Sequence, residues 1–154
     1  MKTKIIYITF CTLITALLVK TCRSQSIKSY IPSATCIFIA GLSDGLRDAS
    51  MYRMDGYGNW WNGKDSWTNK YKNRDIKQGP AFWGSTSIFV PITDAPHASD
   101  LLTHQADNMA ALLMPVDNNK RFWHLMLKAG AETLIRTSAH YLMYDIIFKP
   151  QGRD

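Results

Sequence analysis

Cysteine is scarce in this chain of 154 residues, and its three positions, Cys11, Cys22 and Cys36, form no CxxC pair. A zinc ribbon and a thioredoxin-type redox motif are therefore excluded, because both need closely spaced cysteine pairs. If the N-terminal apolar run is removed on export, Cys36 alone is left and no internal disulfide can form. Cys36 lies among apolar residues, where we expect a small core side chain rather than a nucleophile.

The sequence also lacks a long block of one charge sign. Its net charge is +6 and its pI is about 9.3, but no run of five basic residues occurs. The positive charge is spread over both ends and the middle, so we expect no nucleic-acid partner. A composition of 46% hydrophobic and 19% charged residues is typical of a folded protein, and the length fits one domain.

The N-terminus contains an apolar run. Lys2 and Lys4 precede Ile5–Val19, fifteen residues without a charge. This pattern predicts that residues 1–24 are a signal peptide or a retained membrane anchor, and that residues 25–154 are a single helical domain. As a helix the run would be about 22 Å long, short of a bilayer core of about 30 Å, and we leave both alternatives open. Either one places the protein in the cell envelope, membrane-associated or periplasmic.

The fold class predicted for the body is mainly α, a small domain of about three helices. Pro32 precedes the first helix and Ser33 is expected to cap it, while Thr93 or Asp94 is expected to cap the second. Apolar residues at helical spacing give the ranges Ser33–Met54, Asp94–Met114 and Phe122–Phe148.

Two spacings predict how these helices contact their surroundings. Gly41 and Gly45 form a small-xxx-small pair, which lets two helix backbones approach closely. We expect this pair to pack against another helix, and a partner protein or a second copy of the chain is one candidate. In the last helix Glu132 lies four residues before Arg136, the favourable order for an exposed ion pair.

An aromatic and basic loop separates the first two helices. Residues 55–84 hold four of the five tryptophans, and their glycines and asparagines predict an irregular loop with one helical turn near Ser66–Tyr71. Indole and ammonium groups occur together at the boundary between lipid and water, so the expected partner is an anionic membrane surface. The side chains predicted at this interface are Trp60, Trp61, Trp67, Lys70, Lys72 and Trp83.

Carboxylates and imidazoles at helical spacing supply the alternative, a divalent metal. One face of the second helix carries two histidines and two aspartates. They are His97, Asp100, His104 and Asp107, which follow one another at intervals of three, four and three residues. Such a set could serve a metal-dependent hydrolase, but it is also what the polar face of an amphipathic helix would contain. If the protein is a membrane-associated protein without catalysis, we expect no cofactor. If it is a hydrolase, we expect a divalent metal with the candidate ligands Asp44, Asp48, His97, Asp100 and His104.

Four short motifs together resemble a group of short, uncharacterised bacterial envelope proteins. They are AGLSDG (Ala40–Gly45), WTNKYK (Trp67–Lys72), QGPAFWGST (Gln78–Thr86) and TDAPH (Thr93–His97), and the resemblance covers roughly residues 33 to 100. It implies membrane association and brings no established activity. After Asp100 this chain is more polar than that group, which argues against repeated membrane crossing. The sequence therefore predicts a membrane-associated envelope protein without an assignable catalytic activity.

Overall fold

The structure, a computed structural model, describes residues 27–55, 57–115 and 122–149. This part of the chain is mainly helical, and within it the only β pairing is the isolated antiparallel bridge between Tyr71 and Pro80. The mainly α fold class is thus confirmed. The predicted signal peptide or anchor at residues 1–24 lies outside the described residues.

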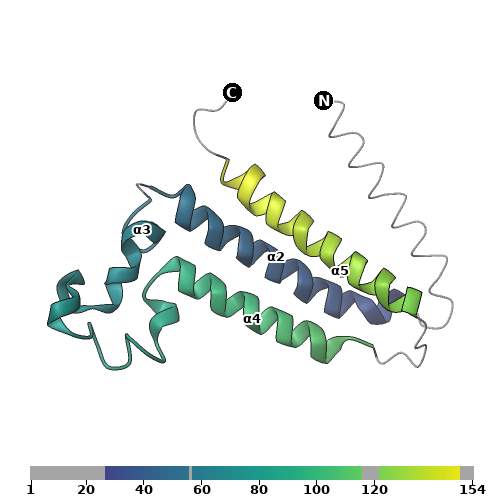
Figure 1. Ribbon diagram of the computed structural model, residues 1–154, viewed down its shortest axis with the longest axis horizontal. Helices are drawn as coiled ribbons and strands as arrows, with labels where there is room; N and C mark the ends of the chain where they lie inside the picture. Colours follow the sequence, from purple (N-terminus) through teal and green to yellow (C-terminus); the bar gives the residue numbers. More distant parts are fainter. Residues whose placement is uncertain (1–26, 56, 116–121, 150–154) are drawn as a thin grey trace.

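Three long helices form an elongated body in which α2 (Ile31–Tyr52) lies between α4 (Ala95–Leu113) and α5 (Phe122–Tyr141) (Figure 1). Helix α4 runs in the opposite direction to α2, and α5 runs in the same direction (Figure 1). A short 3-10 turn, η1 (Ile27–Tyr30), leads into α2. Because α2 contacts both neighbours, its sequence has to provide two packing faces.

Small side chains fill the contacts that α2 makes with its neighbours. Apart from Ile37, every buried residue of α2 is Gly, Ala or Ser, and small residues of this kind let helix backbones approach closely. On α4 the buried residues are also small. They recur at intervals of three and four and so form one stripe along the helix. These buried residues are Ser33, Ala40, Gly41, Ser43, Gly45, Ala49 and Ser50 on α2, and Ala95, Ser99, Thr103, Ala106 and Ala110 on α4.

Gly41 and Gly45 pack against α5 of the same chain. A Cβ atom on Gly41 would lie 2.8 Å from the Ala139 Cβ and would overlap the Arg136 carbonyl oxygen. A Cβ on Gly45 would lie 2.7 Å from the His140 carbonyl oxygen. A partner protein or second copy binding through these two glycines would therefore have to displace α5.

The helix ends correct one predicted cap and confirm another. The cap at Ser33 is wrong, because α2 begins at Ile31 with a proline in its first turn, and the Ser33 hydroxyl instead donates to the Ala110 carbonyl of α4 at 3.0 Å. Asp94 caps α4, since its carboxylate accepts a hydrogen bond from the His97 backbone N–H at 2.9 Å. The Ser33 hydroxyl therefore joins α2 to α4 instead of capping α2.

The last predicted helix continues beyond α5 as a π-helix, η6 (Leu142–Ile147). Arg53, at the end of α2, holds this turn in place. Its guanidinium pairs with Asp145 at 3.0 Å, lies 3.3 Å from the ring centroid of Tyr144, and donates to the carbonyls of Tyr144 and Phe148. This one side chain therefore joins the C-terminal ends of α2 and η6.

The segment predicted as an irregular Trp-rich loop contains a series of short helical turns. They lie beyond the ends of α2 and α4, at one end of the body (Figure 1). Backbone hydrogen bonds between Lys72 and Gly79, and between Ala81 and Lys70, join the middle of this segment to itself. The turns within it are α3 (Gly63–Ser66), η2 (Trp67–Lys70), η3 (Lys72–Arg74) and η4 (Ile76–Gln78), and a further turn, η5 (Val90–Ile92), follows it before α4.

Candidate functional site

Asp44, in the middle of α2, binds side chains of both neighbouring helices. Its Oδ2 accepts hydrogen bonds from Arg136 Nε at 3.0 Å and Nη2 at 2.6 Å, and its Oδ1 accepts one from the Thr103 hydroxyl at 3.3 Å. Its side chain is only 17% exposed. Asp44 therefore draws partners from both α5 and α4.

Arg136 extends this contact to the far helix. Its Nη1 donates to both carboxylate oxygens of Asp107 on α4 at 3.0 Å. The hydrogen bond with Asp44, and then that with Asp107, raises the pKa of Arg136 although burial opposes the charged form. The predicted pair of Glu132 with Arg136 is replaced, because the partners of this guanidinium among the described residues are the two aspartates.

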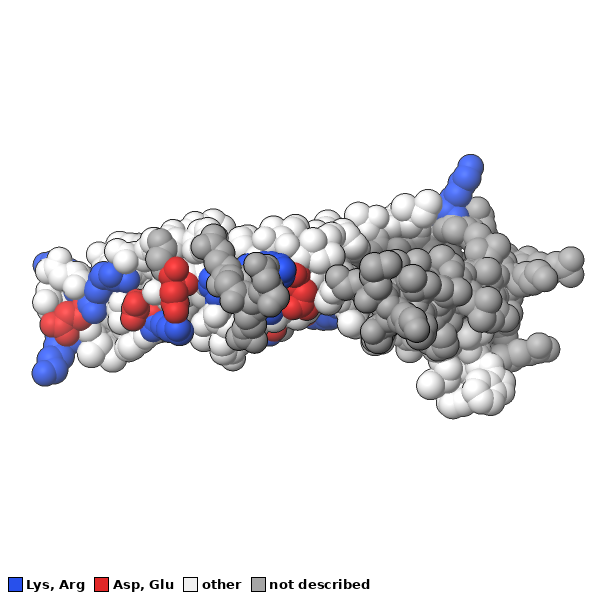
Figure 2. All heavy atoms as spheres, turned by 90° about the horizontal axis from the view of Figure 1, so that it is seen from above, with Lys and Arg blue, Asp and Glu red and all other residues white. Residues whose placement is uncertain are grey.

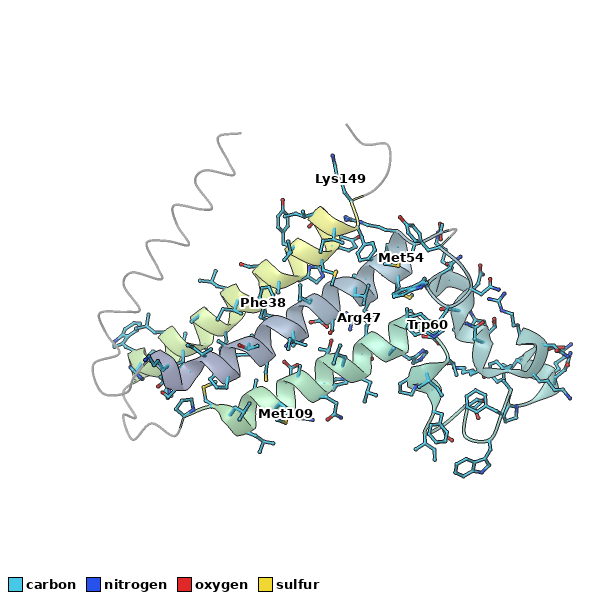
Figure 3. The ribbon with its side chains drawn as sticks, turned by 180° about the vertical axis from the view of Figure 1, so that it is seen from behind. Phe38, Arg47, Met54, Trp60, Met109 and Lys149 are labelled. Carbon is cyan, nitrogen blue, oxygen red and sulfur yellow. The ribbon has the colours of Figure 1, made fainter. Side chains whose placement is uncertain are left out.

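A second cluster surrounds Arg47, which lies between α2 and α4 (Figure 3). Its Nη1 donates to Asp100 at 3.0 Å, and its Nη2 donates to the neighbouring Asp48 at 3.2 Å. The hydrogen bond with Asp100 is the largest cause of the raised pKa of Arg47. The other oxygen of Asp48 lies 3.0 Å from Nε2 of His140 on α5, so this cluster also joins all three helices.

The two clusters together form what we call the interhelix polar network, with four carboxylates against two guanidinium groups and one imidazole. Each of the four carboxylates has a guanidinium partner within 3.2 Å. Three of these pairs, those of Arg47 with Asp100 and of Arg136 with Asp44 and Asp107, join different helices. The members are Asp44, Arg47, Asp48, Asp100, Asp107, Arg136 and His140.

The structure brings together three of the five predicted metal ligands. The Arg47 guanidinium lies at the centre of Asp44, Asp48 and Asp100. The positive charge between these carboxylates is therefore that of the arginine side chain. His97 is bound elsewhere, and His104 is exposed on α4. In the described ranges no three His, Cys, Asp or Glu side chains are close enough to hold a metal ion. The metal hypothesis stays a prediction.

His97 contacts the carboxylate that caps its own helix. Its Nδ1 lies 2.7 Å and 2.8 Å from the two oxygens of Asp94, whose side chain is 1% exposed, and the Thr93 hydroxyl donates to the same carboxylate at 3.2 Å. Asp94 thereby receives partners for both of its oxygens although it is buried. An N-cap aspartate supported by its own first turn accounts for this arrangement.

The predicted interface tryptophans differ in how firmly they are held. Trp60 donates its indole N–H to the Ile92 carbonyl at 3.2 Å and meets Trp61 edge-on, with ring centroids 4.7 Å apart. Trp67 meets Tyr71 edge-on, and the Lys70 ammonium lies 5.6 Å from the Tyr71 ring centroid. Lys72 is exposed. Trp83 is 79% exposed, the largest exposure among these four indoles.

Large apolar side chains cover the outside of the three helices. Met109 lies on the side of α4 away from α2 (Figure 3), and Leu112 on the same helix is 79% exposed. On the face seen in Figure 2, the red side chains lie beside blue ones over the long helices, and residues that are neither acidic nor basic cover most of the remaining described surface. Exposed apolar residues of the helices include Ile31, Phe38, Ile39, Leu101, Leu102, Met109, Leu112, Leu113, Phe122, Trp123, Leu125, Met126 and Leu127.

Among the helices that the structure describes, none combines the length and the apolar character needed to cross a bilayer. Comparisons of the chain with protein-family models, with curated proteins and with solved structures find no match in any of the three.

Proposed function

We propose that this protein is a membrane-associated protein of the cell envelope, in which the outer apolar faces of α2, α4 and α5 contact lipid. Its role in this proposal is structural, and no catalytic step is assigned to it. The group of envelope proteins that its short motifs resemble has the same association with membranes. The expected localisation is the membrane fraction of the envelope.

The observation that carries the proposal is the distribution of side chains across the helices. The contacts between helices contain glycine, alanine, serine and the interhelix polar network, whereas leucine, isoleucine, phenylalanine and tryptophan face outwards. In water the large apolar side chains would be expected inside, and a contiguous exposed set of them marks an interaction surface. A lipid environment favours small-residue packing and internally paired charges.

The aromatic and basic segment between α2 and α4 supports the same proposal. It lies beyond one end of the long helices (Figure 1), where helices in contact with lipid would give way to the aqueous phase. Exposed indoles beside exposed Lys72 and half-buried Lys70 suit this boundary, because the ring has an apolar body and the ammonium group prefers the headgroup region.

Fractionation of cells that express the full chain tests the proposal. We expect recovery in the membrane fraction, with release by detergent and retention after washing with concentrated salt. Retention in salt is the informative step, because a purely electrostatic attachment is lost when charges are screened. Recovery as a freely diffusing monomer in the soluble cytoplasmic fraction would contradict the proposal.

The metal-dependent hydrolase is the second candidate, and metal analysis of the purified protein decides it. That hypothesis requires a stoichiometric divalent metal that His97→Ala and His104→Ala remove. Asp44 and Asp100 already accept hydrogen bonds from arginines and would have to give these up to bind a metal ion. Our proposal therefore predicts that neither histidine variant changes the metal content. A stoichiometric metal lost in both variants would replace our proposal with the hydrolase.

A further inference from the structure

One turn of the segment between α2 and α4 presents four large apolar side chains to the outside. We call Phe82, Trp83, Ile88 and Phe89 the aromatic tip. They are exposed by between 40% and 79%, and the ring centroid of Phe89 lies 6.5 Å from that of Phe82 and 5.9 Å from that of Trp83. The tip is therefore one contiguous apolar cluster rather than scattered surface residues.

The backbone holds this cluster in a fixed shape. Gly84 has a φ of +79°, and a Cβ on it would lie 2.8 Å from the Phe89 ring, so the turn is closed against its own aromatic side chain. The Phe89 N–H donates to the Gly84 carbonyl at 2.9 Å. The buried Ser85 hydroxyl donates to the Lys70 carbonyl at 2.7 Å and ties the turn to the segment behind it. An apolar cluster held in this way is pre-organised to bind.

Four basic residues precede the tip in the chain, within a hairpin that leads into it. Lys72 N–H donates to the Gly79 carbonyl at 2.9 Å, and Ala81 N–H donates to the Lys70 carbonyl at 2.9 Å, so the backbones of these two lysines lie beside the short stretch that leads into Phe82. The acidic neighbour Asp75 is half-buried and accepts hydrogen bonds from the backbone of Lys77 and the side chain of Gln78. We call Lys70, Lys72, Arg74 and Lys77 the basic edge.

We infer that the aromatic tip inserts into a bilayer and that the basic edge selects anionic phospholipid headgroups. The inference rests on the proposed function and deepens it, since it names the inserting element and the lipid class. An apolar cluster that follows directly on a basic hairpin matches the interface of an anionic leaflet, where acyl chains lie below phosphate groups. The interhelix polar network, in contrast, contains more carboxylates than guanidinium groups and offers no such complement.

Vesicle binding by the purified full chain tests the basic edge. The probes are vesicles of phosphatidylcholine alone and of phosphatidylcholine mixed equally with phosphatidylglycerol. The double variant Lys72→Gln/Lys77→Gln should bind the anionic vesicles roughly 30-fold more weakly than wild type, because each basic side chain near such a surface contributes about a factor of five. On neutral vesicles it should match wild type. The control Lys28→Gln removes an exposed lysine near the start of α2 and should leave both unchanged.

Fluorescence quenching by lipids brominated along their acyl chains tests the tip. Two variants each keep one indole, Trp83 or Trp123, and carry phenylalanine at the other four tryptophans. At lipid concentrations that bind all of the protein, Trp83 should be quenched more strongly by anionic than by neutral vesicles, whereas Trp123 on α5, 75% exposed, should be quenched equally by both. Replacing Trp83 by serine in the full chain should weaken binding on the order of tenfold.

The outcomes separate the inference from the proposal beneath it. Equal binding of wild type and Lys72→Gln/Lys77→Gln to anionic vesicles, or an unquenched Trp83, overturns the inference while membrane association stands. Failure of the wild type to bind either vesicle, together with soluble recovery from cells, overturns both. A dimer that Trp83→Ser dissociates would assign the tip to a second copy of the chain and overturn the lipid assignment. All variants share residues 1–26, so differences between them report the tip and its edge.

Discussion

Arg136 on α5 donates two hydrogen bonds to one oxygen of Asp44 on α2, at 3.0 Å and 2.6 Å. The same guanidinium reaches Asp107 on α4, so a single side chain connects three helices. Among the four carboxylates of the interhelix polar network, Asp44 has the least exposed side chain. The stability of the helix arrangement should therefore respond to this pair more than to pairs on the surface.

Arg136→Met tests this contact. It keeps an unbranched apolar stem but removes the guanidinium and leaves Asp44 without its main partner, so we expect a loss of about 1–3 kcal/mol in unfolding free energy, the lower end reflecting the exposure of Arg136. Denaturant unfolding followed by circular dichroism measures it. Arg74→Met, whose guanidinium donates to the Asn69 side chain near the surface, should cost less than about 0.5 kcal/mol.

A double-mutant cycle sharpens the same prediction. Asp44→Asn removes the charge that Arg136 neutralises, so the combined variant should lose less stability than the sum of the two single changes, with a coupling of at least about 0.5 kcal/mol. Additive losses would mean that the pair does not interact in solution.

Close approach of α2 and α5 predicts opposite effects for alanine at two glycines. Gly41→Ala should destabilise by about 1–3 kcal/mol, because the new methyl group overlaps the Arg136 carbonyl and neither backbone can yield easily. Gly130→Ala, on an open face of α5, should stabilise by up to about 1 kcal/mol through its higher helix propensity. Thermal unfolding of both variants checks the pair. Equal effects would show that α2 and α5 do not pack through Gly41.

The cap of α4 predicts a loss of stability when its carboxylate is removed. Asp94→Ala leaves the first turn of α4 without its N-cap acceptor and His97 without a partner, and should cost about 1–2 kcal/mol. Asp55→Ala, which removes an exposed ion pair with Lys64, should change unfolding by less than about 1 kcal/mol. Similar losses in both would mean that Asp94 does not serve as the cap.

The pH dependence of stability should change at Glu132. Burial raises the pKa of this carboxyl and the nearby Lys128 only partly opposes the shift, so folding disfavours the ionised form relative to the unfolded chain. Its contribution to stability is present below the ordinary glutamate pKa of about 4.3 and is lost as pH rises through the folded value. Glu132→Gln should therefore raise the melting temperature at pH 7, and this gain should disappear in acid. A gain that is the same at both pH values would contradict the assignment.

The helices could be predicted from the sequence because their signals are local. Pro96 in a first turn, Asp94 as a cap and Pro115 beyond the end mark α4 to within one residue, and small residues at Gly41 and Gly45 indicated a close helix contact. The cap at Ser33 was mispredicted because local spacing cannot show that its hydroxyl has a better acceptor on α4, 77 positions away.

The interhelix polar network needed the tertiary structure. Helical spacing placed Asp44 with Asp48, and Asp100 with Asp107, but no local pattern gives the register of α5 against α2 that brings Arg136 to Asp44. Glu132, four residues away, was the nearer candidate by sequence and was wrongly preferred. The spacing of histidines and aspartates suggested a metal, but in the fold Asp44, Asp48 and Asp100 pair with Arg47, and Asp44 also pairs with Arg136 on α5.

Labelling from within the lipid tests most directly whether the outer faces of the helices meet a membrane. The full chain is reconstituted into vesicles that contain a lipid with a photoactivated carbene on its acyl chain, and modified residues are mapped by mass spectrometry. We predict labels on Met109, Leu112 and Trp123 and none on Asp44 or Asp100. Labels absent from all three apolar residues, with the protein recovered free of vesicles, would contradict the account.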